Sequence, residues 1–83
     1  MATILHIDQD EAAQNFIQSI LGQQFNVVSA ADGPTAVQYC AMIQPDLIML
    51  DLGLPDGSGL DVLRRIRSVP EQRGGHRHRL AAG

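Results

Sequence analysis

The run of four apolar residues from Leu47 to Leu50, bounded by an acid on each side, constrains the fold more than any other stretch of the chain. No polar residue interrupts it, which is typical of a strand covered on both faces of a parallel sheet. Asp51 follows the run directly and opens a loop rich in Gly and Pro, residues 52–59. Ligands of open α/β sheets bind outside the carboxyl ends of such strands. The run therefore predicts an α/β fold with an acid at its ligand-binding edge.

Apolar runs and helical periodicities alternate along the first 67 residues. Strands that alternate with helices over short links form right-handed βαβ units around a parallel sheet. With the first strand in the centre, the strand order is 2-1-3, and Asp8 and Asp51 then lie side by side at the carboxyl edge. The predicted strands are residues 4–7, 26–30 and 46–50, and the predicted helices are residues 11–21, residues 34–44 and a third from about 58 or 59 to a point before Pro70.

The helices are predicted from apolar residues at three- and four-residue spacing. Asp10 is a candidate N-cap of the first helix, Gly22 supplies a stop, and Pro34 opens the second helix. The third helix is expected to turn Arg64, Arg65 and Arg67 outward. The expected buried faces consist of Ala13, Phe16, Ile17, Ile20 and Leu21 in the first helix, and of Leu60, Leu63 and Ile66 in the third.

Chain length and cysteine content limit the classes of protein to which the chain can belong. An 83-residue chain makes one domain at most and hides only about 60% of its unfolded surface, so its size alone favours oligomerisation. The one cysteine, Cys40, cannot form an intrachain disulfide, and its apolar neighbours predict core packing in a protein of the reducing cytoplasm. No run approaches the roughly 18 apolar residues of a membrane span, so no membrane association is expected.

Charge is divided sharply along the chain. Residues 1–63 hold eight acids and no Lys or Arg, a formal charge of −8, whereas residues 64–83 hold six Arg and one acid, a charge of +5. An acidic surface repels the phosphate backbone of nucleic acids. We therefore expect no nucleic-acid interface on the globular part.

Two motifs carry a resemblance to a known family. Residues 51–59, Asp-Leu-Gly-Leu-Pro-Asp-Gly-Ser-Gly, are similar to the phosphoacceptor loop of the receiver domain of bacterial two-component response regulators (CheY-like), and residues 4–11 resemble its first strand and acidic turn. The resemblance covers residues 4–67, which is three strand/helix units where the family has five. It implies a truncated flavodoxin-like fold, a three-stranded parallel sheet of order 2-1-3 with flanking helices. Residues 1–67 are the predicted receiver-like domain, and residues 68–83 are a basic, non-receiver tail.

The resemblance also implies a site. Asp51 would be the phosphoacceptor, and Mg²⁺ would be held by Asp8, Asp51 and the backbone carbonyl of Gly53. Gln9 departs from the family, which usually has a second acid there, so we expect weakened Mg²⁺ binding. Asp10 could swing inward as a replacement, although its role as a helix cap is the favoured interpretation.

Other candidate residues have structural interpretations that we favour. His6, inside the first strand, is expected to be a satisfied core histidine, and Asp56 and Asp61 to be a turn residue and a solvated helix acid. His76 and His78, two residues apart and without nearby acids or cysteines, are only a weak signal for a transition metal.

The resemblance predicts a signalling module and not an enzyme. The family binds the phosphoryl group with a Ser or Thr and a Lys from its fourth and fifth strands, whereas this chain contains no Lys. We expect a phosphoacceptor in a two-component phosphorelay with incomplete switch machinery, whose partner is a sensor histidine kinase or a phosphotransfer protein. The alternative is a degenerate structural or oligomerisation module without phosphotransfer.

A three-stranded sheet would leave the outer side of the third strand unpaired. An unpaired apolar edge is a template for another chain, so two copies are expected to form a dimer through this edge. In the alternative, the Arg-rich tail folds over its own or its neighbour's edge. We also hypothesise that the tail is an out-of-frame remnant of a longer receiver, which the shifted reading frame of the coding DNA would test.

Overall fold

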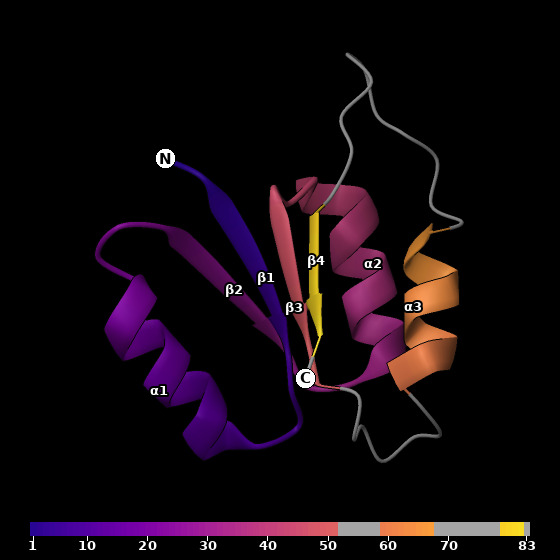
Figure 1. Cartoon of the computed structure of the whole chain (residues 1–83), viewed down its shortest axis with the longest axis horizontal. Coiled ribbons are helices and arrows are strands. Elements are labelled where there is room, and N and C mark those ends of the chain that lie inside the picture. The colour runs from indigo at the N-terminus through magenta and orange to yellow at the C-terminus, as the bar shows by residue number, and fades with distance from the viewer. Residues whose placement is uncertain (52–58, 68–78, 83) are drawn as a thin grey trace.

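The chain forms a parallel sheet with helices on both of its faces, as the computed structural model in Figure 1 shows. The structure describes residues 1–51, 59–67 and 79–82. The strands are β1 (Thr3–Ile7), β2 (Asn26–Ala30), β3 (Leu47–Leu50) and β4 (Arg79–Ala82), and the helices are α1 (Glu11–Leu21), α2 (Gly33–Ile43) and α3 (Gly59–Arg67).

The predicted strand order is confirmed, and one further strand extends the sheet. The order is β2-β1-β3-β4, with every neighbouring pair parallel. β1 lies between β2 and β3, with Ile7 opposite both Ala30 and Leu50. Because all strands run in one direction, their carboxyl ends meet at one edge of the sheet.

The fourth strand corrects the expectation of a three-stranded sheet. Arg79–Ala82, from the predicted tail, pairs with β3 in the register Leu47 to Arg79 and Leu50 to Ala82. The alternative in which the tail folds over its own edge is therefore what the structure has. The pairing satisfies backbone groups that an unpaired β3 would expose. The predicted dimer through the β3 edge loses its basis, because β3 is an interior strand.

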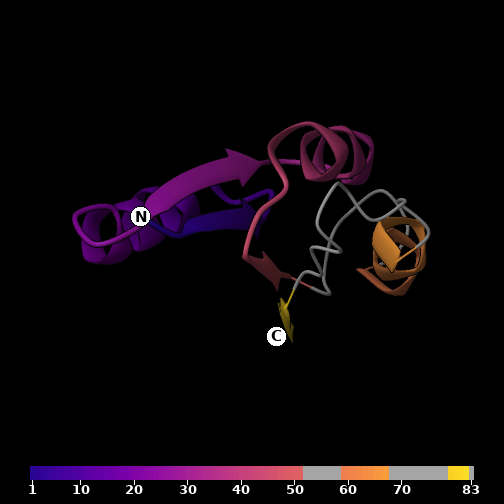
Figure 2. The same cartoon turned by 90° about the horizontal axis from the view of Figure 1, so that it is seen from above.

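The hydrophobic core lies between the sheet and two of its helices. Figure 2 shows α2 and α3 on one face and α1 on the other. The core consists of Leu5, Ile7, Ala30, Ala36, Cys40, Ile48, Leu50, Val62 and Ile66. Cys40 is fully buried, as predicted, and burial raises the pKa of its thiol.

α1 departs from its predicted packing. Its residues Ala13, Ile17 and Leu21 are half-buried, whereas Phe16 is 63% exposed and Ile20 is 51% exposed. No residue of this helix is fully buried. The periodicity correctly predicted an apolar stripe, but only part of the stripe contacts the sheet. The expectation that Phe16 and Ile20 are buried is therefore wrong.

The ends of the first two helices follow the sequence signals. Asp10 caps α1 by accepting a hydrogen bond from the Ala12 amide at 3.0 Å. Asp32 caps α2 in the same way, and Pro34 occupies its first turn. Gln44 is the C-cap of α2, and its φ of 49° lies in the left-handed region that stops a helix.

α3 presents a basic face to solvent. Arg64, Arg65 and Arg67 are exposed, as predicted, while Ile66 is buried and Leu63 is half-buried. Asp61, in the first turn, is exposed and lies 3.9 Å from Arg65 in an ion pair. Within the part of the chain that the structure describes, no helix combines the length and apolar character needed to cross a membrane.

Candidate functional site

Asp8 and Asp51 lie at neighbouring positions on the carboxyl edge of the sheet. Ile7 and Leu50 are paired in the β1–β3 register, and each acid directly follows the last residue of its strand. The Asp51 amide donates to the Ile7 carbonyl at 2.9 Å, and the Asp8 amide donates to the Ala30 carbonyl at 3.0 Å. The backbones of both acids are thus held by the sheet, as expected from the order 2-1-3.

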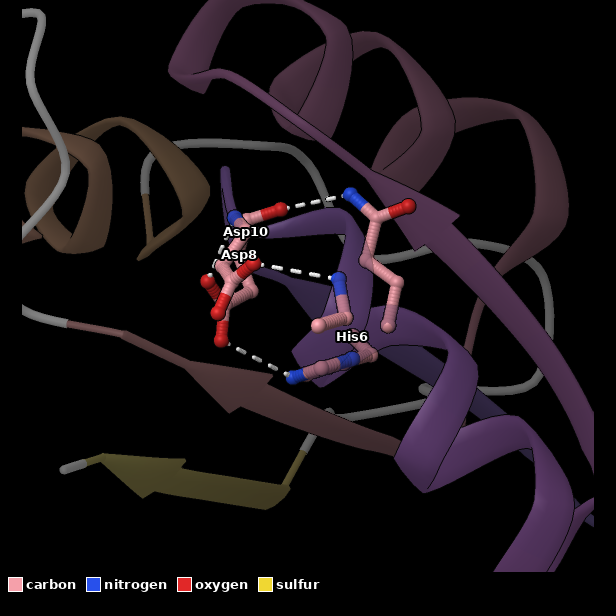
Figure 3. A network of polar contacts seen from close by, with 5 residues as sticks. His6, Asp8 and Asp10 are labelled. Carbon is pink, nitrogen blue, oxygen red and sulfur yellow. Dashed lines mark hydrogen bonds and ion pairs between the residues drawn. The ribbon is translucent and has the colours of Figure 1, made fainter.

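The Asp8 carboxylate is enclosed by its own segment (Figure 3). Its Oδ1 accepts a hydrogen bond from the Asp10 amide at 2.9 Å, and its Oδ2 lies 3.6 Å from Nε2 of His6. The side-chain amide of Gln14 donates to the Asp8 carbonyl at 2.6 Å. The Asp8 side chain is only 14% exposed, so little of this carboxylate is open to water.

The other two residues of the acidic turn are exposed to solvent. Asp10 is exposed and its Oδ1 is engaged by the Ala12 amide, the arrangement expected of a helix cap. Gln9 is also exposed. The structure therefore places the backbones of Asp8 and Asp51 side by side at the edge, while Asp10 caps α1.

A third acid near this edge is also engaged in capping. Asp32 follows β2 by two residues and accepts a hydrogen bond from the Thr35 amide at 2.8 Å. Hydrogen bonds from the Thr35 amide and hydroxyl lower the pKa of Asp32 below its ordinary value. These bonds favour the charged form of the cap.

The donor set that the described residues offer to a metal is small. In residues 1–51, 59–67 and 79–82 no three His, Cys, Asp or Glu side chains form a group that could hold a metal ion. Gly53, Asp56, His76 and His78 lie outside the described residues. Of the described residues, Asp8 and Asp51 offer two carboxylates from neighbouring strand ends. That set fits Mg²⁺, which binds through one or two carboxylates together with water and phosphate oxygens.

Sequence reasoning missed two residues of this site. His6 was expected to be a satisfied core histidine, and it is buried at 5% exposure, but its Nδ1 has no hydrogen-bond partner among the described residues. Its position two residues before Asp8 in a strand was the available signal, because alternate residues share a face. Gln14 reaches Asp8 across six positions, and no periodicity predicts that contact.

Known proteins resemble this chain in sequence. A family model described as the response regulator receiver domain matches residues 4–74. The probable transcriptional regulatory protein TcrX of Mycobacterium tuberculosis is 36% identical over 67 residues, which cover 80% of the chain and 29% of the relative. The cell cycle transcriptional regulator CtrA of Caulobacter vibrioides is 42% identical over 65 residues, which cover 77% and 28%. The chain thus spans less than a third of the length of these two relatives.

Solved structures show the same fold. A CheY-like receiver domain from Methylobacillus flagellatus superposes with a TM-score of 0.89 at 23% identity, covering 99% of this chain and 68% of that one. The N-terminal domain of an uncharacterized protein from Wolinella succinogenes gives a TM-score of 0.82 at 28% identity and covers 99% and 63%. Both superpositions include nearly the whole chain.

Proposed function

The chain belongs to the response regulator receiver domain family, and on this premise we propose that Asp51 accepts a phosphoryl group in two-component signalling. The donor is the phosphohistidine of a sensor histidine kinase or a phosphotransfer protein, and the chain works in the cytoplasm. It undergoes one modification and catalyses no turnover of another substrate.

One observation carries this proposal: Asp8 and Asp51 occupy adjacent register positions at the carboxyl edge of parallel strands. This edge is where α/β sheets bind ligands. A structural role alone would not require two like charges on neighbouring strands, because like charges repel each other and raise the cost of folding.

The transfer is a displacement at phosphorus. A carboxylate oxygen of Asp51 attacks the phosphorus atom while the bond from phosphorus to the donor histidine nitrogen breaks. That nitrogen keeps the electron pair of the broken bond and takes up a proton from solvent. The product is an aspartyl phosphate. The hydrogen bond from the Asp51 amide to the Ile7 carbonyl keeps the backbone of the nucleophile in place during attack.

Asp8 and Asp51 would together hold Mg²⁺, with water and phosphoryl oxygens completing the shell. When bound, the ion offsets the negative charge that gathers as the phosphoryl group approaches two carboxylates. The contribution of this chain is to present two oxygen donors from neighbouring strands. We propose the backbone carbonyl of Gly53 as a further ligand and the neutral Gln9 as the cause of weakened Mg²⁺ affinity. Asp10 could become a ligand only by giving up its hydrogen bond from the Ala12 amide.

The proposed response is incomplete within these 83 residues. They contain no Lys, so the ammonium group that the family places beside the phosphoryl group cannot come from them. We therefore propose that the response of this chain to phosphorylation requires a cationic group from outside these residues.

Mass spectrometry tests the proposal. Incubation with acetyl phosphate and MgCl₂ should add one phosphoryl group to the parent protein and to Asp61→Asn, a control that removes an exposed carboxylate on α3. Asp51→Asn should remain unmodified. An unchanged mass of the parent, with acetyl phosphate and with purified histidine kinases, would contradict the phosphoacceptor role, as would modification of Asp51→Asn.

A second candidate function is a module that self-associates without phosphotransfer. The exposure of Phe16 and Ile20 on α1 favours it, because two large apolar side chains four residues apart form a stripe that a second copy would cover. Light scattering separates the candidates. A dimer that is never phosphorylated supports this alternative, and a monomer at micromolar concentration contradicts it.

A further inference from the structure

His6 lies on the face of β1 that leads to the proposed site. Its neighbours Leu5 and Ile7 belong to the core beneath α2 and α3, so His6 shares the opposite face with Asp8. Ser29 and Met49 are its register partners on β2 and β3. The imidazole is 5% exposed, and Figure 3 shows its ring extending toward the Asp8 carboxylate.

Packing alone is a poor reason for an imidazole at this position. An aliphatic side chain would fill the same space, whereas the Nδ1 atom of His6 is buried and, in the part of the chain that the structure describes, has no hydrogen-bond partner. A buried polar atom without a partner destabilises the fold. The benefit that offsets this cost must lie at the other nitrogen, Nε2, which faces Oδ2 of Asp8 at 3.6 Å.

The contact fixes the position of a proton on the ring. Two lone pairs facing each other at this distance would repel, so Nε2 is a nitrogen that carries a hydrogen. At 3.6 Å the contact is an electrostatic one, and an approach of about 0.5 Å would bring the two atoms within hydrogen-bond range.

We propose that His6 is a positioning residue for Asp8, an inference that rests on the proposed function of Asp8 as a metal ligand. Oδ1 is held by the Asp10 amide at 2.9 Å, and the N–H of His6 faces Oδ2, so each carboxylate oxygen faces one donor. The donor from His6 also counteracts repulsion from Asp51 on the next strand. Groups that do not touch a metal but hold one of its ligand side chains in position raise the affinity for the metal.

The first test needs no metal. In the ¹⁵N-labelled full chain, the ring nitrogen shifts of His6 should show hydrogen on Nε2. In His6→Phe, the amide of Asp10 should exchange with solvent several-fold faster, because the carboxylate that accepts its hydrogen bond has lost its second contact. The amide of Asp8, which donates to Ala30, is the internal control and should not change. His6→Gln, which restores an N–H donor, should return the Asp10 amide to the parent rate.

The second test measures Mg²⁺ binding by calorimetry. His6→Phe should weaken binding by about tenfold, the lower end of the usual effect of such a residue, and His6→Gln should recover most of it. If the parent binds Mg²⁺, equal binding by His6→Phe would overturn the inference. So would a ring with hydrogen on Nδ1 and none on Nε2, a result that needs no variant and stands even if His6→Phe fails to fold.

The two tests separate the inference from the function on which it rests. If the parent binds no Mg²⁺ but the Asp10 amide responds to His6→Phe and recovers in His6→Gln, the proposed function fails while His6 still positions Asp8. If the parent binds Mg²⁺ and the exchange rate of the Asp10 amide is the same in both variants as in the parent, the proposed function stands and the role of His6 is wrong.

Discussion

Replacing Gln9 by an acid should strengthen Mg²⁺ binding at the carboxyl edge. Gln9 directly follows Asp8 and is exposed, so an added carboxylate would act through water more than through protein. At about 5 Å from a divalent ion it is worth about 1.7 kcal/mol in water, and about 1 kcal/mol after screening at 0.1 M salt. Gln9→Glu and Gln9→Asp should therefore lower the Kd for Mg²⁺ by roughly 5- to 15-fold.

Isothermal titration with MgCl₂ at fixed ionic strength measures this change. Gln23→Glu is the matched control, because it adds the same charge at an exposed position in the turn before β2. That turn lies at the amino ends of the strands, with the roughly 16 Å length of β2 between it and the site. Screening should leave Gln23→Glu with the parent affinity. Equal affinity of Gln9→Glu and the parent, or an equal gain in Gln23→Glu, would refute the reasoning.

Three further outcomes follow from burial and capping. The lowered pKa of Asp32 contributes stability at pH values above its unfolded value of 3.8, and this contribution is lost as the pH falls through the folded value. The urea midpoints of the parent and Asp32→Ala should therefore differ at pH 6 and converge at pH 2. A constant difference between the midpoints would contradict the capping role. Ile48→Ala should lower the free energy of unfolding by about 2–5 kcal/mol, because Ile48 is fully buried, and a loss below about 1 kcal/mol would mean that the core is not packed as described. Phe16→Gln with Ile20→Gln should change stability by about 0.5 kcal/mol or less for each residue and reduce any self-association in light scattering, whereas a large loss would show that α1 buries both residues.

The sheet was predictable because its strands are apolar runs that end in acids. The predicted strand over residues 4–7 differs from β1 by one residue, and alternation with helices gave the order in which Asp8 and Asp51 meet. β4 carries no comparable signal, since Arg-Leu-Ala-Ala has a charge, one large apolar residue and no β-branched residue. Its pairing depends on the side of β3 that β1 does not occupy, and this side exists only in the tertiary structure.

Packing and side-chain contacts were predictable only in part. Periodicity placed Phe16 and Ile20 on the apolar stripe of α1, but it contains no information on how wide a surface the sheet offers to that stripe. The strand period put His6 and Asp8 on one face, yet the 3.6 Å contact depends on side-chain rotamers, as does the lack of a partner for Nδ1 among the described residues. Cys40 was predicted correctly because burial of a small apolar side chain needs no specific partner.

The central place of β1 bears on how the chain folds as it is made. β1 is synthesised first, but its pairing with β3 joins residues 43 positions apart, as between Ile4 and Leu47. Synthesis of that interval takes roughly 2–9 s at the usual speed of a ribosome. Until then only β2 can pair with β1, and the other side of this apolar strand stays open. The nascent chain therefore passes through a stage at which it can bind chaperones or aggregate before its own third strand emerges.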